Sequence, residues 1–370
     1  KTSGDREGIP AEYATQLLAV INALNNMEQS DISHMCGTRG IGVLVSDTMM
    51  FQRAEPNQSD PDMGSFYGLA LPLLKLGIPV EPVQLETIKT LGALDRYQLL
   101  LLTYEGQKPL LSEYHDQLTA WVKKGGMLLF VDDGSDPYNH VREWWNGNGK
   151  HATSPGDDLL KRLGVQNDIQ SGPQPVGEGY IWVISASPQE LQRIEAGAAQ
   201  IQEAVKELLM LKNIPLEIQN YLGVQRGPYI VASVLDESIS EEPLIFRGSY
   251  IDIFNPLLPW IDKRVLIPNE RTLLYDIGWA KENGMKAGVL AAAARIREEQ
   301  LKDNTFTFSM RGPANTTGRA RVLLPGAPVL ITSTPKIDME QKWHEQSSTL
   351  WISFPNTAAS VSVTILFDVQ

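Results

Sequence analysis

Cysteine is almost absent from this chain, which contains only Cys36, in the segment HMCGTRG. A single cysteine excludes an intrachain disulfide and any zinc site built on several thiolates. Cys36 precedes the first expected strand, and no neighbouring motif marks it as a nucleophile, so a packed or semi-exposed thiol is favoured. The five histidines are scattered and show no HExxH-like spacing, so we expect no metal site.

Basic residues are also in deficit, with 32 Lys and Arg against 44 Asp and Glu, for a net charge of −12. Binding to nucleic acid needs stripes of Lys and Arg that neutralise phosphates, and no such stripe is present. The acidity likewise disfavours an anionic membrane surface. No run approaches the roughly 20 apolar residues of a membrane span. We therefore expect a soluble protein, and leave open whether it is cytoplasmic, periplasmic or secreted.

The motifs that commonly mark phosphate binding and acyl chemistry are missing too. The chain has no GxGxxG, no GxxxxGK[ST] and no GxSxG. The segments GTRGIG and GNGK are too short and wrongly placed to serve as phosphate loops. We expect no cofactor and no serine or cysteine acyl-transfer chemistry.

What is present, in the first part of the chain, is an alternation of strands and helices. Residues 10–29 predict one amphipathic helix, and short apolar runs at residues 40–46, 78–86, 97–103, 127–133 and 178–185 predict strands. Helices are expected between them, including one long helix from residue 188 to 211 with Ser187 as its N-cap. Such alternation favours an α/β fold with a mostly parallel sheet and helices on both faces, of the flavodoxin-like or amidotransferase-like kind.

The pattern changes at Ile214. Short alternating runs separated by Gly, Pro and Asn turns continue to the end of the chain and predict an antiparallel β-sandwich. We therefore expect three parts: residues 1–37 as the helical end of another domain plus a linker, 38–213 as the α/β domain, and 214–370 as the sandwich.

Carboxylates stand where several expected strands end. Ligands of open α/β sheets bind beyond the carboxyl ends of the strands, which makes Asp47, Glu105, Asp132 and Asp133 candidate catalytic residues. Two carboxylates whose pKa values are split can act as general acid and base. The competing interpretation, which we favour, is that they cap helices or form turns.

Two loops are candidates for ligand binding. The first, from Asp47 to Tyr67, mixes aromatic and charged residues, including Arg53 and Tyr67. The second holds Trp144 and Trp145 among Asn, Asp and His, a combination typical of a sugar-stacking surface. Docking against a neighbouring domain or subunit, and a cover over the sheet edge, remain open alternatives.

Several segments together resemble one family. GVLVSD, YGLALPLLKLGIPVEPV, the stretch from Tyr97 to Asp133 and GEGYIWVISASP resemble the class I glutamine-amidotransferase-like domain that follows the catalytic barrel of large bacterial glycosidases. The trimerisation domain of bacterial (β/α)8-type β-galactosidases is the nearest case. Segments after residue 222 resemble the small β-domain of those enzymes, and residues 8–27 resemble the last helix of the barrel.

The resemblance implies an accessory role rather than chemistry. Amidotransferases carry a cysteine at a nucleophile elbow, whereas Cys36 precedes the first strand, so none of their catalytic residues carries over. The catalytic carboxylates of the glycosidases lie on barrel strands, which would be upstream of residue 1. The resemblance thus implies an oligomerisation or substrate-wall region, with an upstream barrel and further copies of the chain as partners.

Two alternatives stay open. The chain is an autonomous carbohydrate hydrolase that uses its strand-end carboxylates, or it is a carbohydrate-binding module that acts through Trp144, Trp145, Trp260 or Trp279. Whether the chain is an enzyme is left undecided by the sequence.

Overall fold

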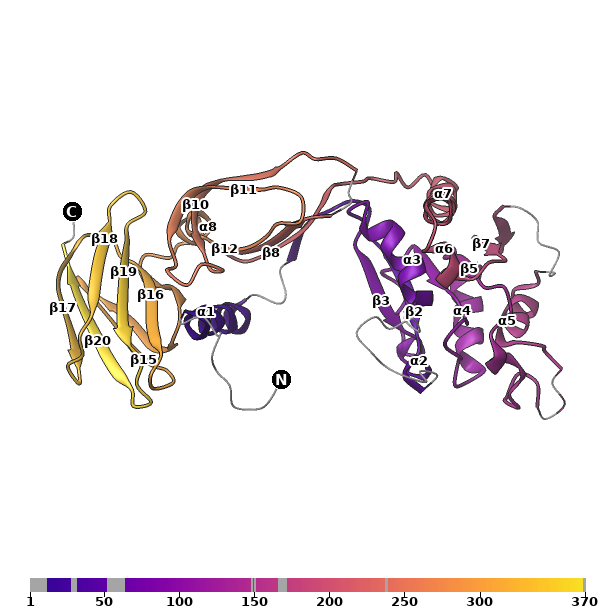
Figure 1. Cartoon of the computed structure of the whole chain (residues 1–370), viewed down its shortest axis with the longest axis horizontal. Helices are drawn as coiled ribbons and strands as arrows, with labels where there is room; N and C mark the ends of the chain where they lie inside the picture. The colour runs from indigo at the N-terminus through magenta and orange to yellow at the C-terminus, as the bar shows by residue number, and fades with distance from the viewer. Residues whose placement is uncertain are drawn as a thin grey trace. The chain divides into compact units, whose positions relative to one another are not determined.

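The computed structural model describes residues 12–27, 32–51, 64–147, 149, 151–165, 172–236 and 239–368. They form two compact units (Figure 1). One unit spans residues 36–222 and 237–240, and the other combines residues up to Met35 with 223–236 and 241–370. The domain limits expected at residues 37 and 213 stay predictions.

The unit from Cys36 to Leu222 is an α/β sheet of six strands in the order β3-β2-β4-β5-β7-β6. The strands are β2 (Ile41–Val45), β3 (Val80–Gln84), β4 (Leu99–Leu102), β5 (Met127–Val131), β6 (Gln174–Val176) and β7 (Gly179–Ile184). All neighbours pair in parallel except β6, which runs antiparallel to β7. The expected mostly parallel sheet is confirmed.

Helices cover both faces of this sheet. They are α2 (Thr48–Phe51), α3 (Gly64–Leu74), α4 (Glu113–Lys123), α5 (Pro155–Leu163), α6 (Pro188–Leu191) and α7 (Glu195–Met210), with short 3-10 turns η2 (Leu85–Thr87) and η3 (Pro137–His140). Strand β4 explains the two layers, because side chains alternate between the faces of a strand. Leu100 and Leu102 pack with α4 and α5, whereas Leu99 and Leu101 pack with α3 and α7.

The helix expected over residues 188–211 is divided in two. Ser187 accepts a hydrogen bond from the Glu190 N–H and caps the short α6, and α7 begins only at Glu195. A side chain on Gly197 would come within 2.2 Å of the Leu191 carbonyl oxygen, so glycine permits the tight junction between the two helices.

The other unit contains a six-stranded antiparallel sheet in the order β1-β8-β9-β12-β10-β11. Its strands are β1 (Ile32–Met35), β8 (Tyr221–Arg226), β9 (Tyr229–Val234), β10 (Leu244–Asp252), β11 (Trp260–Leu266) and β12 (Arg271–Asp276), and helix α8 (Ile277–Glu282) follows. Residues 32–35, expected as linker, thus form an edge strand that pairs with β8.

Two four-stranded antiparallel sheets complete this unit as the expected sandwich. Their orders are β13-β16-β19-β18 and β14-β15-β20-β17. The strands are β13 (Gly288–Ala292), β14 (Arg295–Lys302), β15 (Thr305–Arg311), β16 (Thr317–Leu323), β17 (Pro328–Thr334), β18 (Glu340–His344), β19 (Thr349–Pro355) and β20 (Val361–Phe367). Phe306 and Phe308 from one sheet pack with Ile352 and Phe354 from the other in a shared core.

Helix α1 (Tyr13–Asn26) belongs to the same unit, where it lies beside the sandwich (Figure 1). Its buried residues Ala19 and Ala23 share a core with Tyr229 and Tyr275 of the six-stranded sheet and with Leu323 of the sandwich. The Thr15 hydroxyl donates to the Thr317 carbonyl oxygen over 2.8 Å. The amphipathic helix expected near the start of the chain is therefore an integral part of the β-rich unit.

Candidate functional site

The carboxyl ends of β4, β5 and β7 border a cavity of about 400 Å³. Parallel strands bring their ends to one edge of the sheet, and this is where open α/β folds place ligands. The cavity is lined by Ser65, Glu105, Gly106, Asp133, Ser135, Asp136, Pro137, Tyr138, Ser187, Gln189 and Glu190. Of the four candidate carboxylates, Glu105 and Asp133 line it.

Glu105 is the most unusual group at this edge. Both of its carboxylate oxygens are buried, and neither makes a hydrogen bond of standard geometry. Burial raises the pKa of Glu105, the nearby charges of Asp133 and Asp132 raise it further, and the Ser187 hydroxyl and the Gln189 backbone partly offset the rise. A carboxyl group with a raised pKa can act as a general acid, so Glu105 has the electrostatics of a catalytic residue.

A buried ion pair stabilises the loop that follows Glu105. The ammonium group of Lys108 lies 2.8 Å from Asp136 Oδ2, and both side chains are buried. Burial lowers the pKa of Lys108, and the hydrogen bond with Asp136 opposes that shift. Asp136 also accepts backbone N–H bonds from Gly106 and Tyr138, at 2.7 and 2.8 Å. The pair therefore anchors backbone on both sides of the cavity.

The Gln107 side chain connects the same loop to the end of the neighbouring strand β2 through hydrogen bonds. Its amide nitrogen donates to the carbonyl oxygens of Leu44 and Thr103, and its side-chain oxygen accepts the Ser46 N–H over 2.7 Å. All of these groups are buried, so each must be paired to avoid the cost of an unsatisfied polar group. Sequence reasoning passed over Gln107, Lys108 and Asp136 because nothing local distinguishes them from surface loop residues.

Asp132 also holds backbone. Its carboxylate accepts the N–H of Tyr104 over 2.9 Å and that of Gly134 over 2.7 Å. Burial raises the pKa of Asp132, and these two hydrogen bonds counteract the rise. Asp132 thereby connects the ends of β4 and β5, the turn-forming role weighed against catalysis in the sequence.

The other two candidates are exposed. Asp133 accepts the Ser135 N–H over 2.8 Å, and it lines a second cavity of about 250 Å³ together with Asp132. Asp47 accepts a hydrogen bond from the Gln84 side chain over 2.9 Å and lines neither cavity. The four carboxylates thus do not share one cavity, and their catalytic role stays a prediction.

Cys36 precedes β2 and so lies toward the amino end of that strand, away from the carboxyl edge of the sheet. It is half-buried, and burial raises the pKa of its thiol. A raised pKa reduces the thiolate fraction on which nucleophilicity depends.

A chain of buried polar groups crosses one face of the sheet. The Tyr104 hydroxyl lies 2.6 Å from His115 Nε2, and His115 Nδ1 lies 2.9 Å from Asp158 Oδ2. Burial lowers the pKa of His115, so we assign a neutral ring that donates from Nδ1 and accepts at Nε2. The arrangement resembles a catalytic relay, but His115 and Tyr104 are buried away from both cavities.

Of the candidate ligand-binding residues, Trp144 and Trp145 pack edge-on against each other, with ring centroids 5.6 Å apart. Trp145 is 2% exposed and donates its indole N–H to the Asn139 carbonyl oxygen. Trp144 donates to the Pro109 carbonyl oxygen and packs edge-on against His115. Tyr67, on α3, is 41% exposed, and Arg53 lies outside the described residues. Their role in ligand binding stays a prediction.

An aromatic hollow in the β-rich unit was only partly anticipated. Its volume is about 370 Å³, and its lining includes Trp260, His344 and Trp351. The rings of Trp260 and His344 lie 4.4 Å apart between centroids. The sequence singled out Trp260 but neither of its partners, because β11, β18 and β19 meet only through the fold.

In the described ranges, no group of three or more His, Cys, Asp and Glu side chains could hold a metal ion. In the same ranges, no helix is long and apolar enough to cross a membrane.

Comparison with known proteins gives matches at the level of structure. A beta-galactosidase from Bacillus circulans sp. alkalophilus matches 64% of this chain and 41% of its own, with 10% identity and a TM-score of 0.33. A catalytic mutant of Gan42B, a GH42 beta-galactosidase from G. stearothermophilus, matches 65% of this chain and 40% of its own, with 13% identity and a TM-score of 0.38. The beta-galactosidase from Rahnella sp. R3 matches 64% and 40%, with 11% identity and a TM-score of 0.34.

The chain is structurally similar to GH42 beta-galactosidases. It spans about 40% of the length of those structures. No protein-family model matches the sequence, and no curated protein matches it either. At 10–13% identity the similarity does not extend to activity, and the chain's own residues must carry any functional argument.

Proposed function

We propose that this chain is a non-catalytic accessory region of a larger glycoside-hydrolase-like protein, in which another domain packs against helix α1. The catalytic carboxylates would belong to that domain, as two carboxylates flanking the scissile glycosidic bond. The α/β unit would contribute to oligomerisation and to the wall of a sugar site.

The observation that carries the proposal is an uncovered apolar stripe on α1. Tyr13, Leu17, Ile21 and Leu24 are 50%, 44%, 44% and 55% exposed. They recur at the spacing of one helical face, opposite the face that buries Ala19. A surface helix normally turns such a stripe toward a core, and contiguous apolar patches mark interaction sites.

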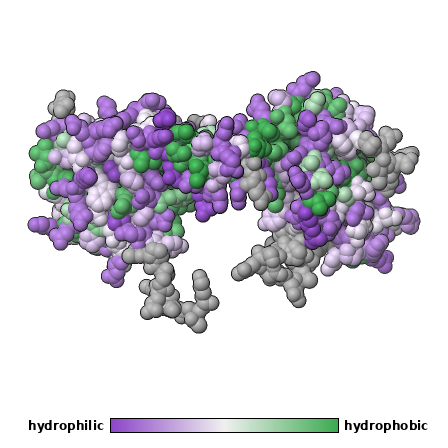
Figure 2. Space-filling view, turned by 45° about the horizontal axis from the view of Figure 1, so that its top comes forward, coloured by the Kyte–Doolittle hydropathy of each residue, from purple (hydrophilic) through white to green (hydrophobic). Residues whose placement is uncertain are grey.

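The stripe is held in place rather than free to rearrange. Glu12, just before the helix, forms an ion pair with the largely buried Arg319, and Gln16 donates to the Phe254 carbonyl oxygen over 2.6 Å. Asn22 donates to the Ala292 carbonyl oxygen over 2.8 Å. On the face shown in Figure 2, hydrophobic residues gather in small patches among hydrophilic ones on both units.

The strand ends of the α/β unit support a non-catalytic role. The carboxylates of Asp132 and Asp136 each accept hydrogen bonds from two backbone N–H groups, so both stabilise the local backbone. Among the candidates, only Glu105 combines burial with the absence of a standard hydrogen bond. Of the other acids that line the same cavity, Asp136 accepts backbone N–H groups and Asp133 and Glu190 are exposed, so none of them is a second buried acid available to act with Glu105.

The coding sequence upstream of Lys1 tests the proposal directly. We expect it to encode a (β/α)8 barrel of roughly 250 residues or more. If it instead encodes no folded domain, the proposal fails, and the strand-end carboxylates become the first candidates for an active site.

Sedimentation of the chain alone tests the stripe itself. We expect self-association that grows with protein concentration, because the apolar stripe is uncovered, and its loss in Leu17→Glu/Leu24→Glu. The matched control is Leu91→Glu/Val329→Glu, which changes two exposed leucine and valine residues outside α1. A monomeric wild-type chain that behaves like both variants would contradict a docking role for α1.

The autonomous-hydrolase alternative has its own test. The chain alone should not release nitrophenol from nitrophenyl glycosides above the buffer rate. Turnover that disappears in Glu105→Gln or Asp132→Asn would replace the accessory role with catalysis at the strand ends.

Carbohydrate binding is a second candidate function, favoured by the aromatic hollow at Trp260, His344 and Trp351. Aromatic faces pack against the apolar C–H faces of sugars, and a mostly apolar lining with a few polar groups is typical of ligand sites. Titration with neutral oligosaccharides should change the tryptophan fluorescence of the chain and leave that of Trp351→Ala unchanged. A flat response in the wild-type chain would remove this candidate.

A further inference from the structure

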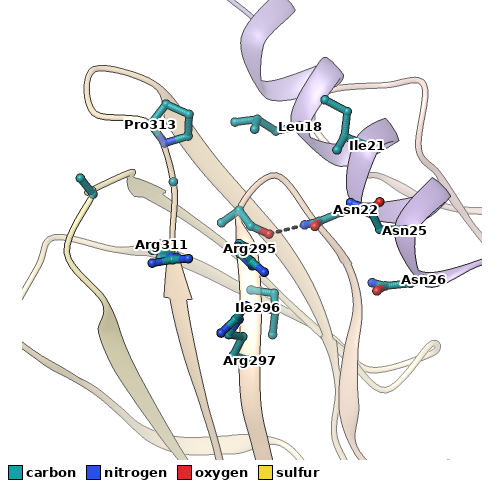
Figure 3. Close-up of a pocket in the computed structure, with 13 residues that line it drawn as sticks. Leu18, Ile21, Asn22, Asn25, Asn26, Arg295, Ile296, Arg297, Arg311 and Pro313 are labelled. Carbon is teal, nitrogen blue, oxygen red and sulfur yellow. Dashed lines mark hydrogen bonds between the residues drawn. The ribbon is translucent and has the colours of Figure 1, made fainter.

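A hollow in the described part of the β-rich unit lies between helix α1 and the sandwich. Its volume is about 760 Å³, within the range of small-molecule sites. Three arginines line it: Arg295 and Arg297 from β14 and Arg311 from β15. Asn25 and Asn26 of α1 border it from the other side. Figure 3 shows the arginine side chains on the strand side of the hollow and the asparagines on the helix side.

The register of the strands makes the three arginines neighbours on the sheet. Arg295 pairs directly with Arg311 across β14 and β15, and Arg297 lies two residues along β14 on the same face as Arg295. Like charges directly opposite each other destabilise a sheet. In the described ranges none of the three is within 4.0 Å of a carboxylate oxygen, so no ion pair offsets this repulsion.

Protection of a sheet edge accounts for only part of this pattern. β14 is an edge strand, and charged residues on edge strands discourage aggregation. Arg311, however, lies on β15, an inner strand, where no edge needs protection. The nearby carboxylate of Glu299 is engaged elsewhere, since it accepts the Val289 N–H over 2.8 Å. The three arginines therefore give the hollow a local positive charge, although the net charge of the protein is −12.

The hollow is also rigid at its helical wall. The Asn22 amide donates to the carbonyl oxygens of Ala292 and Ala294, which fixes α1 against the start of β14; Figure 3 draws the bond to Ala294. Ile296 and Pro313 add apolar surface to the lining. Arginine binds carboxylate and sulfate groups through two parallel N–H bonds, and asparagine amides both donate to and accept from hydroxyl groups.

We propose that this hollow binds an acidic sugar, with a carboxylate or sulfate group held by Arg295 and Arg311 and ring hydroxyls held by Asn25 and Asn26. The choice of a sugar rests on the proposed function, whereas the anion site rests on the arginines alone. Nucleic acid is disfavoured because the lining contains no aromatic residue on which a base would stack.

Calorimetric titration of the full chain at constant ionic strength tests the proposal. The probes are a galacturonic-acid trisaccharide, a sulfated galactose oligosaccharide, a neutral galactose trisaccharide and sodium sulfate. We expect at least one acidic sugar to bind saturably, and roughly tenfold or more tighter than the neutral sugar and sulfate. The acidic probe that binds identifies carboxylate or sulfate as the recognised group.

The variant Arg295→Gln/Arg311→Gln should weaken that binding about tenfold or more. Its charge-matched control is Lys302→Gln/Arg271→Gln, which removes two exposed cations away from the hollow and should bind like the wild-type chain. An unchanged melting temperature shows that both variants fold.

Three results would overturn the proposal: no saturable binding of either acidic sugar, binding that the Arg295→Gln/Arg311→Gln variant leaves intact, or equal binding of sulfate or the neutral sugar. The proposed accessory role would be untouched by these results, because it depends on the apolar stripe of α1 and on the upstream coding sequence.

Discussion

At the scale of single residues, the main distinction is between carboxylates whose hydrogen bonds stabilise the α/β unit and a carboxylate whose burial destabilises it. Asp132 and Asp136 accept backbone N–H groups, and Asp158 is bound by His115 and Arg162. Glu105 is buried without a standard hydrogen bond. Glu105 and Asp132 both follow a strand closely in the sequence, so only their surroundings separate their roles.

Glu105→Gln should stabilise the α/β unit at neutral pH. The folded state raises the pKa of Glu105 above its usual value near 4.5, so the unfolded chain ionises first as pH rises. Ionisation of Glu105 therefore lowers the free energy of unfolding of the wild-type chain above pH 4.5. The variant should have a free energy of unfolding about 0.5–1 kcal/mol higher than the wild type at pH 7, but almost the same at pH 4. Thermal unfolding at both pH values measures the difference. Glu190→Gln, at an exposed position on the same cavity, is the control, and an equal gain there would refute the role of burial.

Asp158→Asn should have the opposite effect. Partial burial alone would raise the pKa of Asp158, but hydrogen bonds from His115 and Arg162 lower it to about 2. A depressed pKa contributes stability above the unfolded value near 3.8, and this contribution disappears as pH falls toward 2. We expect a loss of about 1–3 kcal/mol at pH 7 that shrinks below pH 3.8. Urea unfolding from pH 7 to pH 2 measures it, and a loss independent of pH would contradict this account.

At the scale of elements, close approaches decide how helices pack. A side chain on Gly68 of α3 would come within 2.0 Å of the Pro188 carbonyl oxygen at the start of α6. Backbone cannot give way as a flexible side chain does, so the contact between these two helices requires glycine.

Gly68→Ala should therefore destabilise the α/β unit by about 1–3 kcal/mol, although alanine is the better helix former by about 1 kcal/mol. The melting temperature of this unit measures the outcome. Leu71→Ala, at a partly exposed position of the same helix, should have a smaller effect. A stabilised Gly68→Ala variant would show that α3 and α6 can separate without cost.

At the scale of the whole molecule, the two units have separate cores and should respond separately to core mutations. Helix α1 comes first in the described sequence, yet it shares its core with strands that follow residue 223. The core of the β-rich unit therefore draws on both segments, whereas the cores of the α/β unit contain residues of neither.

Ala23→Glu should destabilise the β-rich unit by about 3 kcal/mol or more, because it places an unpaired carboxylate in the core under α1. Hydrogen exchange followed by peptide mass analysis should show faster exchange in residues 223–236 and 241–368 and unchanged exchange in residues 64–147. Leu24→Glu, one residue away on the exposed stripe, is the control. Faster exchange in both units would contradict their independence.

The sequence by itself determined the class of fold and the absence of a nucleophile-elbow motif. Apolar runs such as Leu99–Leu102 and the alternation after Ile214 are local signals, since burial on one or both faces of a strand is written in neighbouring residues. The absence of a cysteine or serine elbow is likewise visible in the sequence alone. These features led to the expected parallel sheet, the sandwich and the resemblance to glycosidase accessory domains.

Only the tertiary structure decided what individual polar and aromatic residues do. One partner of Asp132 lies 28 residues away, two partners of Gln107 lie 61 and 63 residues away, and Thr15 bonds to a residue 302 positions along the chain. Whether Trp145 is buried, whether α1 keeps an uncovered stripe and whether Arg295 meets Arg311 all depend on such distant contacts. The hydrophobic periodicity of a segment shows which face of a helix or strand is apolar. Only the tertiary structure determines which neighbouring element that face contacts.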